Sequence, residues 1–83
     1  MSTYTETSIE QRIQAAVCRA LRISDPPAAL RMGSTPGWDS MGHMTVVLEL
    51  EREFNTRFPP YQLPHLVDVA SIVNTLTKAN LVI

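Results

Sequence analysis

The chain has 83 residues, of which 45% are hydrophobic and 18% charged, and its formal net charge is −1. This length allows one small domain over residues 1–83, with an expected ordered core of about 8–78. The composition excludes a disordered charged tail, and the balanced charge argues against a nucleic-acid partner. One cysteine excludes an internal disulfide and a four-cysteine zinc site, so no metal is expected.

The first predicted helix runs from Ser8 to Leu21. Its apolar residues recur at helical spacing, at Ile9, Ile13, Ala16, Val17, Ala20 and Leu21. Ser8 is a candidate N-cap, and Gln11 three residues later completes a capping box. The helix is expected to end near residues 22–23, because Asp25-Pro26-Pro27 follows.

Residues 24–38 are predicted to form a long loop between the first two helices, and loops of this length are often functional. Thr35-Pro36-Gly37-Trp38 matches a type II turn, with proline second and glycine third. The apolar residues in the middle of the loop predict a segment that packs on the core as a short helical turn: Ala28, Ala29, Leu30 and Met32.

The second predicted helix follows Asp39, a good N-cap, and runs from Met41 to Phe54. Its core-facing stripe comprises Val46, Val47, Leu50 and Phe54. Met44 is also expected in the core. Glu49 and Arg52, three residues apart, are expected to pair.

Prolines limit the third predicted helix, across residues 60–66, to about one turn, since proline is tolerated only at a helix start. Asp68 is a natural N-cap for the last helix, which is expected to bury Val69, Ile72, Val73 and Leu76 and to fray near Asn80. No strand pattern competes. The predicted fold is all-α: a small antiparallel four-helix bundle with a short, proline-limited third helix and a long loop between helices one and two.

Ser40 takes the first position of the second helix, directly after Asp39. Its hydroxyl is expected to face solvent beside N–H groups without intrahelical partners, at a helix end that carries about half a positive charge. A phosphodiester on Ser40 would lie where negative charge is favoured. Asp-Ser at a helix start is also ordinary capping, and these two residues alone favour that simpler interpretation.

Four further segments lie at fixed spacing from Asp39-Ser40-Met41 and belong to the same family pattern. They are Ser8–Ile13, Leu48–Phe54, Phe58-Pro59 and Val69–Leu76. Together these segments resemble an acyl carrier protein over residues 8–76, with no gap in register from Ser40 to Leu76.

The resemblance implies a carrier without catalytic activity. A 4′-phosphopantetheine arm from coenzyme A would be attached to Ser40 by a phosphopantetheinyl transferase, with Asp39 helping to hold the transferase's Mg²⁺. The arm would carry an acyl intermediate as a thioester to acyl-loading and acyl-processing enzymes of a dedicated fatty-acid, polyketide or lipid pathway. The sequence has neither a signal-peptide pattern nor an apolar run of ~20 residues for stable membrane insertion, so we expect a cytoplasmic protein, and we expect it to be a monomer.

The chain departs from the acidic character of that family. Gly42 and Thr45 stand where acids are frequent, and Arg52 stands where glutamate is usual. We therefore expect docking by apolar contact more than by charge. The predicted partner-binding residues are Asp39, Met41, Leu48, Glu51 and Arg52.

Three neighbours of Ser40 have open roles. Trp38 is expected to cover the core and fix the loop rather than to contact the arm. Gly42 weakens the helix by up to ~1 kcal/mol against alanine, and it either permits close approach of the transferase or the arm or merely lets the helix end fray. His43 is expected to be a solvated surface residue rather than a phosphate ligand.

Two alternatives remain open from the sequence. An aminoacyl carrier would share the fold and the serine, although peptidyl carriers usually have glycine near the serine where this chain has Trp38-Asp39. A helical interaction module that is never modified is the alternative of another class.

Overall fold

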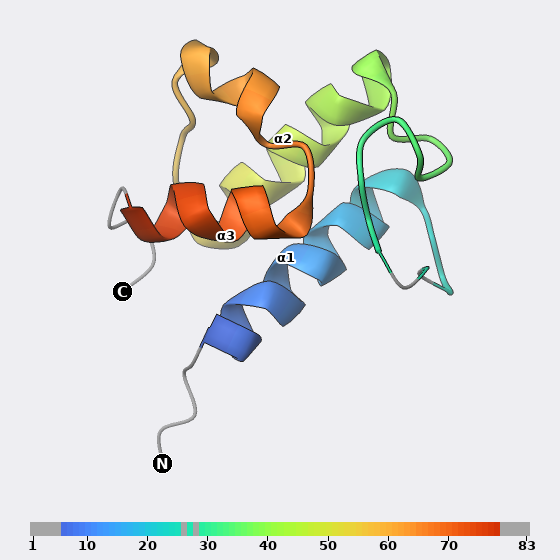
Figure 1. The fold of residues 1–83 in the computed structure, drawn as a ribbon, viewed down its shortest axis with the longest axis horizontal. Coiled ribbons are helices and arrows are strands. Elements are labelled where there is room, and N and C mark those ends of the chain that lie inside the picture. The colour runs from blue at the N-terminus through green and yellow to red at the C-terminus, as the bar shows by residue number, and fades with distance from the viewer. Residues whose placement is uncertain (1–5, 26, 28, 79–83) are drawn as a thin grey trace.

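The computed structural model describes residues 6–25, 27 and 29–78, which are predominantly helical. Three α-helices and one 3₁₀ helix follow one another in this part of the chain: α1 (Glu6–Leu21), α2 (Ser40–Phe54), η1 (Pro60–His65) and α3 (Val69–Lys78). α1 packs against both α2 and α3 (Figure 1). The all-α prediction is confirmed, as are the short third helix and the long loop after α1.

Helix α1 begins at Glu6, two residues before the predicted start. Ser8 therefore lies inside the helix, and the N-cap prediction for Ser8 is wrong because nothing in Glu6-Thr7 obstructs a helical turn. The end agrees with the prediction. Arg22 adopts the left-handed conformation, at φ 59°, and the Ile23 N–H donates to the Cys18 carbonyl over 2.9 Å.

One hydrophobic core joins the helices and their connections. Its buried members are Ile13, Ala16, Val17, Leu30, Trp38, Val46, Val47, Leu50, Phe54, Phe58, Leu66, Ile72 and Leu76. Cys18 is partly buried against this core, and burial raises the pKa of its thiol. The predicted apolar faces of the first, second and last helices thus meet in one cluster.

The long loop is held to the segment before α3. Leu30 is buried, Arg31 forms an isolated antiparallel bridge with Asp68, and the Met32 N–H donates to the Val67 carbonyl over 2.8 Å. The core packing of Leu30 and Met32 is as predicted, whereas the local turn begins only at Arg31, whose carbonyl accepts from the Thr35 N–H over 2.9 Å. Ala29 is exposed, and Ala28 lies outside the described residues.

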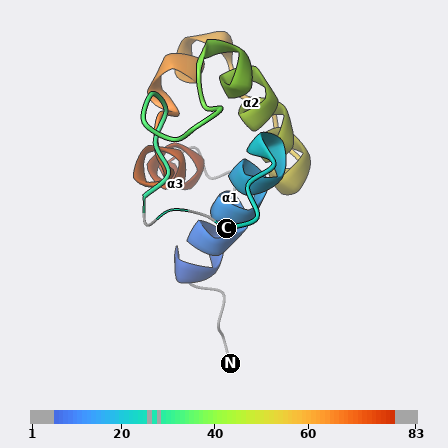
Figure 2. The same cartoon turned by 90° about the vertical axis from the view of Figure 1, so that its right-hand side faces the viewer.

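The end of this loop is the predicted type II turn. The Trp38 N–H donates to the Thr35 carbonyl over 3.0 Å, and Gly37 has a φ of 87°, which the third position of this turn requires. Figure 2 views the molecule from the end at which this loop lies. The turn brings the chain directly into α2.

Local signals account for the remaining element ends. Asn55 ends α2 in the left-handed conformation, at φ 51°. The Asp68 carboxylate caps α3 by accepting a hydrogen bond from the Ser71 N–H over 2.8 Å. Hydrogen bonds from the side chain and the backbone of Ser71, together with the nearby Arg31 charge, lower the pKa of Asp68. α3 fully buries Ile72 and Leu76, while its two valines are partly buried. The predicted fraying at Asn80 lies outside the described residues. Of the helices in the described ranges, none has the length and apolar character needed to cross a membrane.

Candidate functional site

Ser40 is exposed at the first position of α2, as predicted. Asp39 before it is the N-cap, with an extended backbone and a carboxylate that accepts from the Gly42 N–H over 2.8 Å. The first intrahelical bond runs from the His43 N–H to the Asp39 carbonyl over 2.8 Å. The amides of Ser40 and Met41 precede that bond, so they face the solvent end of the helix without an intrahelical acceptor.

Gly42 is the point where the loop touches the first turn of α2. A Cβ at Gly42 would lie 3.0 Å from the carbonyl carbon of Gly37, and it would overlap the carbonyl oxygen outright. Both Gly37 atoms are backbone, so no side-chain rotation relieves the overlap. The structure thus shows a reason for glycine that was not predicted, namely the contact with the protein's own loop, and the two roles expected for Gly42 stay predictions.

Trp38 and His43 form a buried pair behind Ser40. Trp38 is 1% exposed, which agrees with its predicted place over the core, and its indole Nε1–H donates to His43 Nδ1 over 2.9 Å. Because an indole N–H only donates, Nδ1 must accept, and the ring proton sits on Nε2. That Nε2 lies 2.8 Å from the Leu63 carbonyl and donates to it.

The predicted surface position of His43 is therefore wrong. The residue is 7% exposed and bonds the loop on one side of its ring and η1 on the other. Both ring nitrogens are used, so a buried position is compatible with its polarity. The short spacing from Trp38 to His43 was the available signal, whereas the Leu63 carbonyl is 20 residues away.

An apolar stripe runs along the outside of α2 from the Ser40 end. We call Met41, Met44 and Leu48 the outer stripe, and their exposed fractions are 82%, 52% and 57%. Met41 and Leu48 are exposed, as the docking prediction requires. The core position expected for Met44 is wrong, because the helix face that meets the core is defined by His43, Val46, Val47, Leu50 and Phe54.

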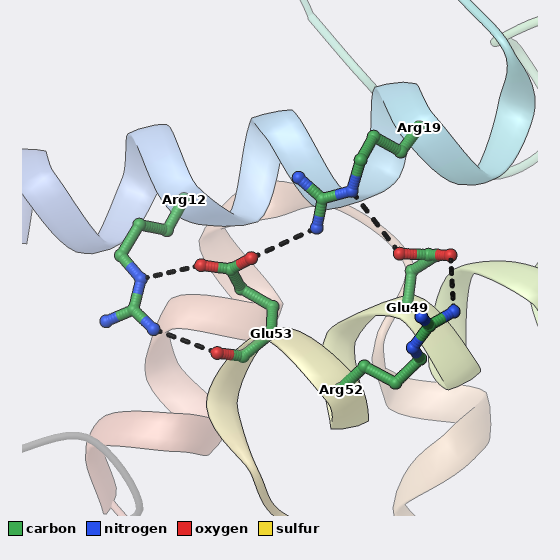
Figure 3. A network of polar contacts seen from close by, with 5 residues as sticks. All are labelled: Arg12, Arg19, Glu49, Arg52 and Glu53. Carbon is green, nitrogen blue, oxygen red and sulfur yellow. Dashed lines mark hydrogen bonds and ion pairs between the residues drawn. The ribbon is translucent and has the colours of Figure 1, made fainter.

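Glu53 of α2 is turned toward α1 and held by two arginines (Figure 3). One carboxylate oxygen lies 2.9 Å from Arg12 Nε, and the other lies 3.0 Å from a terminal nitrogen of Arg19. The hydrogen bond from Arg12, followed by that from Arg19, lowers the pKa of Glu53. Hydrogen bonding to Glu53 in turn raises the pKa of Arg19. The Arg12 guanidinium also lies 4.4 Å from the centroid of the Phe54 ring, in cation–π geometry.

Glu49 is also turned toward α1. It accepts from Arg19 Nε over 3.3 Å, and Arg52 on its own helix lies 3.5 Å away, as the predicted pair (Figure 3). The Arg52 side chain is 79% exposed, against 23% for Glu49. The Arg12 and Arg19 contacts were not predicted. The two arginines lie seven residues apart on α1 and the two glutamates four apart on α2, and Arg19 reaches both glutamates.

The C-terminal end of α2 borders an open hollow. Its lining residues are Leu48, Glu51, Arg52, Asn55, Thr56 and Arg57. One carboxylate oxygen of Glu51 accepts from the Phe58 N–H over 2.9 Å, which joins this predicted partner-binding residue to the chain after the helix. Arg57 is exposed and takes part in none of the ion pairs within the described residues.

The described part of the chain contains no cluster of three or more histidine, cysteine or acidic residues placed to hold a metal ion. Comparisons of the chain with models of protein families, with curated proteins and with solved structures found no match. The functional assignment consequently depends on the geometry around Ser40.

Proposed function

We propose that this chain is an acyl carrier protein that is modified on Ser40. The observation that carries the proposal is the exposed Ser40 hydroxyl at the first position of α2, after the Asp39 cap and beside the outer stripe. The helix order, with a short η1 between longer helices, is that expected of a carrier. We further propose the antiparallel bundle: Arg12, in the middle of α1, pairs with Glu53 near the end of α2, and Arg19, further along α1, reaches back to Glu49 as well as to Glu53.

The residues at Ser40 suit a phosphodiester. The unbonded amides of the first turn and the positive end of the helix favour an attached negative charge. Asp39 keeps its carboxylate on the Gly42 N–H, and its exposure leaves it accessible to the Mg²⁺ of a transferase. Trp38 and His43 lie in the fold behind this turn, so they position the serine and do not obstruct it.

Modification would join the Ser40 oxygen to the phosphorus of coenzyme A that bears the pantetheine. The bond from that phosphorus to the bridging oxygen breaks, adenosine 3′,5′-bisphosphate leaves, and the hydroxyl proton passes to a base of the transferase or to solvent. The attached 4′-phosphopantetheine supplies a terminal thiol that holds an acyl group as a thioester. The carrier itself catalyses nothing: it raises the effective concentration of its cargo at acyl-loading and acyl-processing enzymes. We propose that it does so as a cytoplasmic monomer.

The test is intact-protein mass spectrometry after incubation with coenzyme A, Mg²⁺ and a broad-specificity phosphopantetheinyl transferase. We expect the mass to rise by one phosphopantetheinyl group, and Ser40→Ala to abolish the rise. Ser34→Ala, at another exposed serine, is the matched control and should still be modified. If the wild-type protein never gains this mass, the carrier proposal fails and the alternative of an unmodified helical interaction module remains. If Ser40→Ala is still labelled, the attachment site is another residue.

The group bound to the arm as a thioester is identified in a separate experiment, on carrier isolated from its native cell. Hydroxylamine cleaves thioesters, so the released group identifies the load. An acyl hydroxamate is expected, whereas an aminoacyl hydroxamate would assign the chain to the aminoacyl carriers of the same fold.

A further inference from the structure

On α2, two acidic side chains point toward α1, and a basic side chain points away from it. Glu49 and Glu53 face α1, where arginines hold them, and their side chains are only 23% and 25% exposed. Arg52 projects from the same part of the helix and is 79% exposed. The anions are therefore partly shielded and already paired, while the cation faces outward.

The hollow beside Leu48 adds to the exposed positive charge on the outer side of α2. It adds Arg57 to Arg52, and its single carboxylate, from Glu51, already accepts a backbone hydrogen bond. The link between Arg52 and Glu49 is an exposed i,i+3 pair with a 3.5 Å separation, which is a weak interaction that a better-placed carboxylate can replace.

The outer stripe leads directly into this hollow, because Leu48 belongs to both. Residues 41, 44 and 48 recur at helical spacing, and Arg52 continues the same row one turn later. From Ser40 toward the C-terminal end of α2, the outer surface therefore presents apolar side chains and then guanidinium groups.

We propose that the outer face of α2 docks on an enzyme surface that is apolar in its middle and carries carboxylates at one end. The outer stripe packs on the apolar part, and Arg52 and Arg57 bind the carboxylates, for which guanidinium groups are well suited. This inference rests on the proposed carrier function, which makes the partner an enzyme that acts on the arm at Ser40.

The helix also sets the spacing of such a partner. Twelve residues separate Ser40 from Arg52, which corresponds to ~18 Å along the helix axis. The carboxylates of the partner should therefore lie ~18 Å from the opening that receives the arm, with the apolar contacts between them.

The test uses two synthetic peptides as probes, identical in length and apolar residues. One carries two glutamates at one end and the other carries two lysines there. Each is titrated into the ¹⁵N-labelled full chain, and amide shifts give both the site and the dissociation constant. We expect the acidic peptide to bind about fivefold or more tightly than the basic one, and its shifts to centre on residues 41–57.

Matched variants separate the charge contribution from the apolar one. Arg52→Glu combined with Arg57→Glu should reverse the preference between the peptides, while Arg22→Glu, at an exposed arginine outside the hollow, should leave it unchanged. Leu48→Glu should weaken both peptides. The preference should shrink between ~50 and ~300 mM salt, because exposed charges are screened.

Equal affinity for the peptides, a preference for the basic one, shifts centred elsewhere, or no binding at millimolar concentration would each overturn the docking proposal. Circular dichroism checks that every variant remains folded. Mass labelling of Ser40 is measured on the same samples. Failure of labelling rejects the carrier function, whereas failure of the peptide pattern with normal labelling rejects only this docking surface.

Discussion

Replacing Gly42 with alanine should destabilise the protein, although the same change within a helix ordinarily stabilises it by up to ~1 kcal/mol. The added Cβ would lie 3.0 Å from the Gly37 carbonyl carbon, closer still to its oxygen, and 3.4 Å from a carboxylate oxygen of Asp39. Ordinary contacts between carbon atoms are about 3.5–4.0 Å, so the loop must move by roughly 1 Å or more. Overpacking of this kind costs about 1–3 kcal/mol, and the expected net loss is about 0.5–2 kcal/mol after the helix gain.

Urea unfolding measures this loss. Trp38, the one tryptophan of the chain, reports the loop by fluorescence, and far-ultraviolet circular dichroism reports the helices. The urea concentration at the midpoint of unfolding should fall, while the slope of the unfolding free energy against urea concentration should stay unchanged. Thr45→Ala, at an exposed position one turn further along α2, is the control, and it should be neutral or slightly stabilising. If Gly42→Ala stabilises the protein as Thr45→Ala does, the loop does not pack on α2 as described.

Three further changes probe the core, the buried pair and the ion pairs. Leu50→Ala should lower the unfolding free energy by about 2–4 kcal/mol, since Leu50 is fully buried, and a loss below about 0.5 kcal/mol in urea unfolding would contradict its core position. Trp38→Phe removes the donor to His43 Nδ1 and should cost about 1–3 kcal/mol by thermal or urea unfolding, whereas unchanged stability would show that the bond contributes nothing. The Arg12 hydrogen bond lowers the pKa of Glu53 in the folded protein, so its stabilisation is complete above the ordinary carboxyl value of 4.5 and is lost as pH falls through the lower folded pKa. Unfolding measured from pH 7 to pH 2 should therefore show a shallower acid loss for Glu53→Gln than for the wild type, and an identical pH dependence would contradict the ion pair.

The predictable parts of the fold are those with local causes. Asp39 and Asp68 cap helices through their own side chains, and η1 is short with Pro60 at its start, although it continues past Pro64 and so exceeds the one turn predicted. The same holds at the candidate site, where the Asp39 cap placed Ser40 at the exposed first position of the helix.

The unpredicted parts depend on which segments meet in space. His43 is buried because the Leu63 carbonyl and the Trp38 indole both reach its ring, and no periodicity in the sequence encodes that meeting. The inward turn of Glu53 depends on the register between α1 and α2, which places Arg12 opposite it. The start of α1 was misplaced for another reason: residues that can cap a helix can also sit within one.

The partly buried Cys18 bears on how cleanly such a carrier can hold a thioester. Thioesters exchange with thiolates, and a thiol on the same molecule would compete at a high effective concentration with any enzyme. Cys18 is the only sulfhydryl of the chain, and the burial that raises its pKa keeps it protonated and therefore a poor nucleophile. Under the proposed function, the polypeptide thus neither removes its own cargo nor forms a disulfide readily with its own arm, and the arm's sulfur is the reactive one.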